Sequence, residues 1–212
     1  MALDVVKAYS ERMSVQRSVL DAALEIIAAD GPDAVSMREV ARRAGVSHQA
    51  PYHHFTDRAG IFAAISAEGF LKLAAEVRTV AAHAPNPARS CFEAYLRVAM
   101  TNPGHFRVMF RGDLCGLTTH AEVKAAADQS FNELLRMVGR TIGRPVDEAA
   151  ALTWATLMWS TAHGFATLLI DFPLARRLPP GLSLEQHIDD VVELMGEMAA
   201  RQAASMGVAP IA

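Results

Sequence analysis

Cysteine is scarce in this 212-residue chain, which holds only Cys91 and Cys115. Two cysteines cannot supply the disulfide framework of a small secreted domain, so we expect two buried thiols in a reducing compartment. Aromatic residues make up 7% of the chain, and no stretch alternates apolar and polar residues with β-branched enrichment. With no strand pattern, and with ten methionines available for adaptable helix packing, the composition predicts an all-α fold.

The chain also lacks the short motifs that carry most enzyme chemistry. It has no glycine-rich phosphate loop, no Gly-x-Ser-x-Gly nucleophile elbow, no His-Glu-x-x-His zinc motif and no Glu-x-x-His pair of the di-iron bundles. Four side chains could donate to a transition metal, but their spacing matches no metal motif: His105, Cys115, His120 and His163. We therefore expect no catalysis, no bound metal and no cofactor.

Long uncharged runs are absent with one exception, residues 149–170. This run is long enough to cross a bilayer, but hydroxyl side chains are scattered through it and its flanks, Glu148 and Asp171, are acidic. A helix that is apolar all round is buried inside a protein or at an interface, and we favour that reading. The first dozen residues carry charges and no apolar run, so we expect no signal peptide and a cytoplasmic protein.

The most informative positive signal is the stretch 36–55, SMREVARRAGVSHQAPYHHF. Ser36 is a good N-cap, and Glu39 follows three residues later, as in a capping box. Gly45 suits the end of a first helix, and Ser47 offers the N-cap of a second. Pro51 lacks an N–H, so we expect the second helix to begin a residue or two late. The pattern predicts a helix-turn-helix whose second helix enters the DNA major groove.

Charge and polarity around this stretch fit a DNA-binding role. Between residues 36 and 58, four arginines against two acidic residues leave a net charge of +2, whereas the whole chain carries −3. Polar side chains on the second helix could reach base edges, and the flanking arginines, Arg42 included, could hold phosphates. The residues we expect at DNA are Ser36, Arg38, Arg43, Ser47, His48, Gln49, Tyr52, His53 and Arg58.

The run from Arg17 to Phe70 resembles the DNA-binding domain of TetR-type transcriptional regulators. The resemblance lies in RSVLDAALEIIAADG, VARRAGVS and YHHFTDRAGIF. In that family the Tyr-x-His-Phe run closes the recognition helix, and a long helix then leads into the ligand-binding domain. The family commonly has Lys where this chain has Arg58, which keeps the positive charge. The resemblance implies a regulator that binds double-stranded DNA, with a palindromic operator as its partner.

Two segments further on resemble the C-terminal domain of one TetR subgroup, which is named for a Trp, a His and a Gly. They are NPGHFRVMF at 102–110 and WSTAHGF at 159–165, and we place the three letters on Trp159, His163 and Gly164. The likeness implies a domain that senses a ligand and forms the dimer. Residues that could line a pocket for a hydrophobic effector are Phe106, Met109, Phe110, Met137, Trp154, Met158, Trp159 and His163. The alternative is that these residues are ordinary core.

The expected organisation is a three-helix head followed by a larger helical domain. We expect a mobile arm at 1–13, a helix-turn-helix domain at 14–56 whose first helix covers 14–29, and a connecting helix at 57–82. An effector-binding and dimerisation domain then follows at 83–212, after a boundary at 83–90. Its helices are expected at 87–101, 104–110, 119–141, 147–170 and 183–202, which makes about nine in the chain.

The last two of these helices are the expected dimer interface. The helix at 147–170 is apolar nearly all round, and an apolar stripe follows the helix at 183–202: Leu184, Ile188, Val191, Val192, Met195 and Ala199. Two such helices from each subunit can pack as a four-helix bundle about a two-fold axis. The sequence thus predicts a homodimeric regulator, a repressor released from its operator by a small molecule. The alternatives are an all-α enzyme and a small-molecule-binding protein without regulatory DNA binding.

Overall fold

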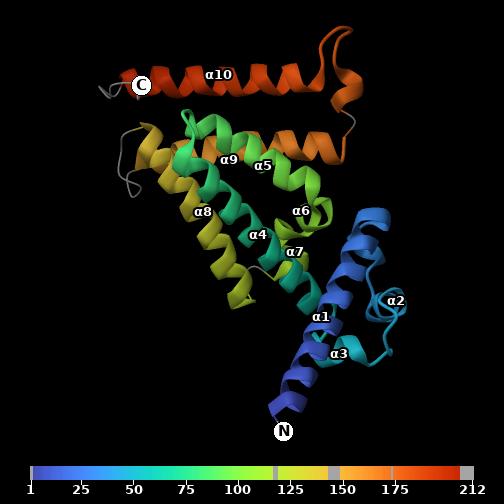
Figure 1. Cartoon of the computed structure of the whole chain (residues 1–212). Helices are drawn as coiled ribbons and strands as arrows, with labels where there is room; N and C mark the ends of the chain where they lie inside the picture. The colour runs from blue at the N-terminus through green and yellow to red at the C-terminus, as the bar shows by residue number, and fades with distance from the viewer. Residues whose placement is uncertain (1, 117–118, 143–148, 173, 206–212) are drawn as a thin grey trace. The chain divides into compact units, whose positions relative to one another are not determined.

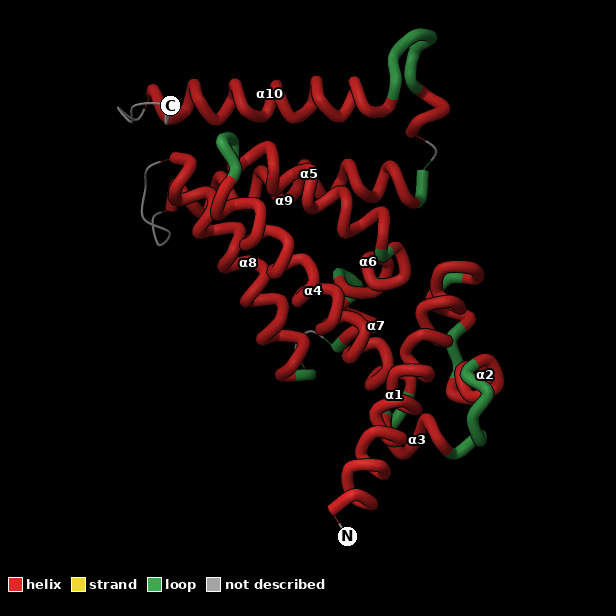
Figure 2. The backbone as a smooth tube through the Cα atoms, viewed as in Figure 1, coloured by secondary structure: helices red, strands yellow, loops and turns green. Residues whose placement is uncertain are grey.

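The computed structural model describes residues 2–116, 119–142, 149–172 and 174–205. In this part of the chain every regular element is a helix and no strand occurs, which confirms the predicted all-α fold (Figure 2). The elements are α1 (Ala2–Asp30), the 3-10 helix η1 (Pro32–Ala34), α2 (Met37–Arg43), α3 (Ala50–His54), α4 (Arg58–His83), α5 (Pro87–Thr101), α6 (Pro103–Met109), α7 (Gly112–Cys115), α8 (Ala121–Ile142), α9 (Ala149–Ile170), the 3-10 helix η2 (Leu174–Arg177) and α10 (Leu184–Ser205).

The helices pack into two units. Unit 1 is the chain up to Phe70 together with Asn102–Ala127, and unit 2 is Leu71–Thr101 together with the chain from Asp128 onward. Helices α4 and α8 therefore contribute residues to both units. The packing division does not follow the boundary expected at 83–90, because the segment after Thr101 packs with the N-terminal helices. Whether function divides at that boundary stays a prediction.

Unit 1 is built around the apolar face of α1. Val19, Ala23 and Ile27 recur at four-residue spacing and are fully buried. They share one core cluster with Phe62 of α4 and Val108 of α6. Burying an aliphatic or aromatic side chain of this size contributes about 1.5–3 kcal/mol. The core of the head is therefore completed by a residue that lies some 80 positions further along the chain, at Val108.

The first helix begins earlier than the sequence pattern indicates. Whether residues 1–13 move as an arm stays a prediction, but α1 is helical from Ala2 and not from residue 14 as the pattern predicts. The physical reason is that 2–30 contains no Gly or Pro that would interrupt a helix. Ser14 does not cap a helix start; its carbonyl accepts a hydrogen bond from Ser18 Oγ at 3.0 Å, as in a helix interior.

Helix α6 packs against both α1 and α4 at close range. A Cβ atom added at Gly104 would lie 3.1 Å from the backbone oxygen of Leu24, and one added at Gly69 would lie 3.0 Å from Met109 Sδ. Arg107 Nη1 donates to the carbonyls of Ile27 at 3.2 Å and Ala28 at 3.1 Å. These carbonyls belong to the last turn of α1, where intrahelical donors run out. Arg107 thus caps α1 from α6.

Unit 2 has α5 and α9 lying side by side, with α10 against α5 (Figure 1). Phe92 of α5 and Phe165 of α9 pack with ring centroids 5.9 Å apart. Arg89 joins α5 to α10, since its Nη2 donates to Asp189 Oδ1 at 2.6 Å. Arg140 of α8 donates to the carbonyl of Ala81 on α4 at 2.5 Å. Apolar contacts at the centre and charged contacts at the rim hold the unit together.

The remaining helices lie close to where the sequence places them. The expected helices at 119–141 and 183–202 are α8 and α10, and α7 is an additional short turn that the sequence analysis did not separate. The helix expected from 147 is described from Ala149 onward. Residues 143–148, where the sequence predicts the gap between α8 and α9, and residues 206–212 lie outside the described residues. Among the described helices, none is long and apolar enough to cross a membrane.

Candidate functional site

The helix-turn-helix is formed by α2, the turn at 44–49 and α3. Ser36 Oγ accepts a hydrogen bond from the backbone N–H of Glu39 at 3.2 Å, so the predicted N-cap is confirmed. Gly45 has φ +68°, and the N–H of Val46 donates to the carbonyl of Ala41 at 3.1 Å. This left-handed glycine with its backward hydrogen bond ends α2 as the sequence predicts.

The second helix of the motif begins later than its expected N-cap. Ser47 does not cap α3; its carbonyl accepts from the N–H of Ala50 at 2.9 Å in a turn, and α3 itself starts at Ala50. The prediction of Ser47 as N-cap is therefore wrong, whereas the expectation of a late start is confirmed. Pro51 explains both, because a proline in the first turn of a helix loses no intrahelical hydrogen bond.

The turn and α3 present polar side chains to solvent. The exposed residues are Ser47, His48, Gln49, Tyr52 and His53. Pro51 and Phe55 are buried and hold the helix to the head, and His54 is partly buried with its ring 6.4 Å from that of Phe55. The rings of His48 and Tyr52 lie 6.0 Å apart, so the two form a pair on the exposed face. Five neighbouring polar side chains are thus available to the edges of bases.

The arginines around this face differ in how firmly they are held. Arg42 donates to both oxygens of Glu39, at 2.8 and 2.6 Å, and Arg43 lies 3.6 Å from the same carboxylate. The hydrogen bond from Arg42 lowers the pKa of Glu39 below its ordinary value, so the acid is charged at neutral pH. Arg38 is exposed, and no acidic partner for it occurs among the residues that the structure describes.

Arg58 has contacts that the sequence pattern does not reveal. Its Nη2 donates to the carbonyl of Pro32 at 2.8 Å and lies 3.6 Å from Asp33 Oδ1. Its guanidinium also lies 4.9 Å from the ring centroid of Phe62. These contacts hold the start of α4 to η1, a structural role that we did not predict. A role in phosphate binding stays a prediction.

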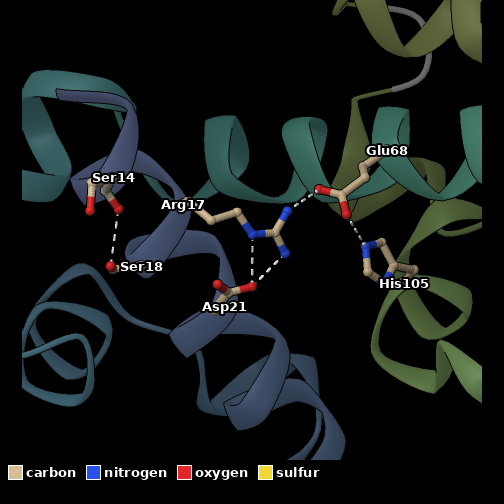
Figure 3. Close-up of polar contacts among 6 residues, drawn as sticks. All are labelled: Ser14, Arg17, Ser18, Asp21, Glu68 and His105. Atoms are coloured by element: carbon tan, nitrogen blue, oxygen red, sulfur yellow. Dashed lines mark hydrogen bonds and ion pairs between the residues drawn. The ribbon is translucent and has the colours of Figure 1, made fainter. Parts of the chain in front are cut away.

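A charged chain links three helices of unit 1 (Figure 3). Arg17 of α1 donates to Asp21 on its own helix and, through Nη1, to Glu68 of α4 at 2.8 Å. The other oxygen of Glu68 lies 3.2 Å from Nε2 of His105 on α6, whose side chain is buried. The hydrogen bond to Asp21 is the largest cause of a raised pKa at Arg17, which keeps the guanidinium charged. Glu68 thus connects α1 to α6.

In unit 2, an aromatic and polar cluster forms where α5, α8 and α9 meet. Tyr95 Oη lies 2.9 Å from His163 Nδ1, and the Trp159 ring lies 6.5 Å from the His163 ring and 6.0 Å from that of Phe131. Burial raises the pKa of Tyr95, an effect that a hydrogen bond from Trp159 opposes. Burial also lowers the pKa of His163. Both groups are therefore neutral at pH 7.

Two members of this cluster were missed by the sequence analysis. Tyr95 lies 68 positions before its partner His163, and Phe131 lies on a different helix again. No local spacing connects them, so only the fold brings them together. The i, i+4 spacing of Trp159 and His163 was the one usable signal, and it correctly placed those two rings on one face.

The other predicted pocket residues do not form one group. Phe106 and Phe110 pack in unit 1, where their ring centroids lie 5.6 Å apart and where Met109 is buried beside Gly69. Met137 is fully buried in unit 2, with Thr141 Oγ1 3.5 Å from its sulfur. Whether these residues line the effector pocket stays untested. The contacts of Met137 are those of an ordinary core residue.

Trp154 and Met158 line a small hollow between α5, α9 and α10. The hollow has an empty volume of about 290 Å³, part of it open to solvent. Its lining residues are Ala88, Arg89, Phe92, Trp154, Met158, Val192, Met195 and Gly196. A Cβ atom added at Gly196 would meet no heavy atom within 4 Å, which agrees with open space there.

Metal binding finds no geometric support in the part of the chain that is described, where no group of three His, Cys, Asp or Glu side chains could hold an ion. The four candidates each have another partner. His105 lies beside Glu68, His120 beside Glu122 and His163 beside Tyr95. The Cys115 thiol donates to the carbonyl of Met109 at 3.8 Å.

Comparison with solved structures identifies several chains of the same fold. A protein with unknown function from Rhodococcus sp. RHA1 is 28% identical, with a TM-score of 0.69 over 89% of this chain and 94% of that chain. A bacterial regulatory protein in the tetR family from Rhodococcus RHA1 is 24% identical, with a TM-score of 0.64 over 87% of this chain and 96% of that one. The TetR family transcriptional regulator PfmR from Thermus thermophilus is 20% identical, with a TM-score of 0.62 over 86% and 97%. At identities below 25% such a likeness shows the fold alone.

Family models match both parts of the chain, whereas no curated protein matches it. Residues 19–65 match the model of bacterial regulatory proteins of the tetR family, and this range contains α2, the turn and α3. Residues 88–191 match the tetracyclin repressor-like C-terminal domain, which contains the Tyr95–His163 contact. The two matched ranges cover most of the chain, and the exposed polar face of the helix-turn-helix lies within the first. The chain belongs to the TetR family of DNA-binding transcriptional regulators.

Proposed function

We propose that this regulator is a homodimeric repressor that leaves its operator when a small, apolar effector binds in unit 2. The observation that carries the proposal is the face formed by the turn and α3, where five polar side chains are exposed with no acidic residue among them. Phosphate contacts from Arg38 and its neighbours would position this face, and His48, Gln49 and Tyr52 would contact base edges.

The dimer interface that we propose lies on the exposed side of α9 and α10. Leu152, Leu157 and Leu168 of α9 are all at least two-fifths exposed in the single chain, and no charged residue occurs anywhere in this helix. On α10, Leu194 is 59% exposed and Met198 is 46% exposed. Large apolar side chains exposed in this number on neighbouring helices are typical of a surface that a second copy covers, and we propose that this is their role.

The stripe on α10 that the sequence analysis assigned to the partner needs a correction. Val192, which lies at its centre, is only 4% exposed in a single chain and lines the hollow against α5 and α9. This part of the stripe packs within its own subunit, because one apolar face of α10 is turned toward α5. Leu194 and Met198, which lie outside that stripe, are the exposed apolar residues of α10 that we propose for the partner.

The effector site that we propose is the cluster of Tyr95, Phe131, Trp159 and His163. Its aromatic rings offer an apolar surface, and the neutral tyrosine and histidine offer hydrogen bonds that could orient a ligand. We also propose that the C-terminal domain belongs to the subgroup named for Trp159, His163 and Gly164. Two of the three lie in the cluster, and Gly164 is exposed on α9 with no heavy atom near its missing Cβ.

Release from DNA follows from two-fold symmetry. The two recognition helices of a dimer must lie about one DNA turn apart, roughly 34–36 Å, to enter successive major grooves. An effector that binds the released arrangement more tightly shifts the equilibrium away from DNA, and a coupling of about 1–3 kcal/mol is ordinary. Because such a protein acts on the chromosome without catalysis, we place it in the cytoplasm.

The experiment that tests this proposal selects a DNA duplex with the protein itself. Repeated rounds of binding and amplification from a random library of short duplexes would yield a high-affinity duplex, whose affinity is then measured by fluorescence polarisation. We expect a selected sequence with two-fold symmetry, and weaker binding after addition of some apolar compounds from a library. Failure to enrich any sequence would contradict the DNA-binding role, and an asymmetric half-site would contradict the dimer.

A further inference from the structure

The exposed face of the turn and α3 lacks the side chains that most often identify a G·C base pair. In the major groove, guanine is read chiefly by arginine or lysine, and the amino group of cytosine is read by a carboxylate. Residues 47–53, SHQAPYH, contain no Lys, Arg, Asp or Glu. The usual readers of both bases of a G·C pair are therefore absent from this segment.

The arginines around this face do not replace them, because three of the four are engaged within the head. Arg42 and Arg43 lie against the carboxylate of Glu39, and Arg58 donates to a backbone carbonyl of η1. Arg38 is exposed on α2, the first helix of the motif, which in such motifs crosses the DNA backbone. Base readout by α3 must therefore rely on uncharged side chains.

Two of these uncharged side chains are held at a fixed spacing. The N–H of Tyr52 donates to the carbonyl of Gln49 at 3.1 Å, and Gln49 has helical backbone angles, φ −84° and ψ −19°. Both side chains are exposed, whereas Pro51 and Phe55 are buried and anchor this turn to the head. Residues three apart on a helical turn have Cβ atoms about 5–6 Å apart, and base pairs rise about 3.4 Å. The pair therefore spans one or two base-pair steps.

The amide of Gln49 matches adenine better than guanine. It places one acceptor beside one donor group, and adenine presents the complementary N7 acceptor and N6 donor. Guanine presents two acceptors, N7 and O6, so that the amide oxygen would face an acceptor instead of a donor. A bidentate contact of this kind discriminates between bases by about fivefold to 150-fold.

The ring of Tyr52 offers an apolar surface, which is what contacts the methyl group of thymine. Tyr52 is 45% exposed, and its ring centroid lies 6.0 Å from that of His48, which limits how far the ring can turn. A neutral imidazole has a single N–H donor, and its natural acceptor, N7, occurs in both purines. His48 therefore supports the tyrosine without itself distinguishing adenine from guanine.

We propose that α3 reads A·T base pairs, with Gln49 bound to an adenine and Tyr52 against the methyl group of a thymine in the same or a neighbouring pair. The inference rests on the DNA-binding function proposed above and specifies the sequence class of the operator. Each half-site then has A·T pairs under α3, and its G·C pairs lie at positions that these two side chains do not read.

The first test repeats the selection of duplexes with Gln49→Ala and Tyr52→Ala. A base-pair position whose preference disappears in a variant is one that the missing side chain reads, and we expect such positions to be A·T in the wild-type selection. Gln49→Arg should select G·C at the position of Gln49, because arginine is the commonest reader of guanine.

The matched control is Gln129→Ala, because Gln129 is an exposed glutamine on α8, outside α2 and α3. It should select the wild-type sequence. Circular dichroism melts verify that each variant is folded.

The second test removes single groups from the selected duplex. Replacing the adenine by 7-deazaadenine removes N7, and replacing thymine by uracil removes the methyl group. We expect wild-type affinity to fall by about fivefold for the lost hydrogen bond and by about fourfold for the lost methyl contact. Fluorescence polarisation at one salt concentration measures both. The first loss should be absent in Gln49→Ala and the second in Tyr52→Ala.

Three results would overturn the inference. The first is a G·C preference at the positions that depend on Gln49 or Tyr52. The second is a uniform loss of affinity for all duplexes in both variants, which would make these residues phosphate contacts. The third is a loss from either base analogue that persists in the matching variant. If the wild type enriches no sequence at all, the DNA-binding function itself is contradicted, and the inference with it.

Discussion

The hydroxyl of Tyr95 lies 2.9 Å from Nδ1 of His163 and joins α5 to α9 across 68 positions of the chain. The tautomer of His163 sets which of the two groups donates in this contact. The contact is partly buried and connects two helices of unit 2.

Removal of the Tyr95 hydroxyl should remove this contact. In Tyr95→Phe, Nδ1 of the partly buried His163 loses its hydrogen bond to the hydroxyl, and we expect the free energy of unfolding to fall by about 1 kcal/mol. Urea unfolding followed by circular dichroism measures the change. Tyr52→Phe is the matched control, because Tyr52 is exposed and its hydroxyl should matter by less than about 0.5 kcal/mol. Equal effects in the two variants would contradict a special role for the Tyr95 hydroxyl.

Stability should also depend on the charge state of His163. Burial lowers its pKa in the folded chain below the ordinary value of 6.5, so below that pH the unfolded chain binds a proton that the folded chain does not. Stability is therefore complete above pH 6.5 and is lost as the pH falls toward the lower, folded pKa. Urea midpoints measured from slightly alkaline to mildly acidic pH should fall less steeply in His163→Gln than in wild type. A steeper fall in the variant would reverse this assignment.

Local signals account for the part of the fold that the sequence predicts well. Ser36, Gly45 and Pro51 each act within one turn of chain, and the structure has the N-cap, the left-handed glycine and the late helix start that they indicate. Helix α1 begins earlier than the pattern predicts, because nothing before residue 14 interrupts a helix.

Long-range contacts account for what the sequence does not predict. The role of Arg58 depends on Pro32 and Phe62, and the aromatic cluster depends on Tyr95 and Phe131, residues that no spacing rule connects. Charge counting misleads for a related reason. The arginines near α3 add up to a basic segment, but Glu39 engages two of them in the folded chain.

This difference between the arginines gives a direct prediction on DNA binding. Arg38→Ala should reduce the salt slope for the selected duplex by about one, since Arg38 has no acidic neighbour among the described residues. Arg42→Ala should reduce it by less, because the bond to Glu39 must break before Arg42 can bind a phosphate. Fluorescence polarisation over a series of salt concentrations separates the two slopes. A larger reduction in Arg42→Ala would reverse the proposed order.

The exposed face of α9 and α10 predicts the outcome of charge substitutions. Leu157→Glu and Leu194→Glu should each shift the protein from dimer to monomer at micromolar concentration, because the interface that we propose buries both side chains. Sedimentation velocity measures the shift. Leu71→Glu is the matched control, since Leu71 is 46% exposed on α4, outside α9 and α10. Folded dimers for both interface variants would exclude this face. Val192→Glu is unsuitable because it would disrupt the subunit itself.

The close approach of α6 to α1 predicts opposite effects for two glycine substitutions. In Gly104→Ala the new Cβ would lie 3.1 Å from a backbone oxygen of Leu24, which cannot rotate away, so we expect a loss of about 1–3 kcal/mol. Gly196→Ala on α10 meets open space and should gain up to about 1 kcal/mol from helix propensity. Urea unfolding gives both values. A stabilised Gly104→Ala would show that α6 is free to shift away from α1.

The position of α6 also limits how this protein can be taken apart and rebuilt. A fragment that ends before residue 83 would leave the α1 core without Val108, the end of α1 without its Arg107 cap and Glu68 without His105. Such a fragment should expose apolar surface and aggregate. Chimeric regulators that join this head to another sensor domain must therefore carry the segment from Asn102 to Ala127 as well. The exchangeable module of this protein is discontinuous in sequence.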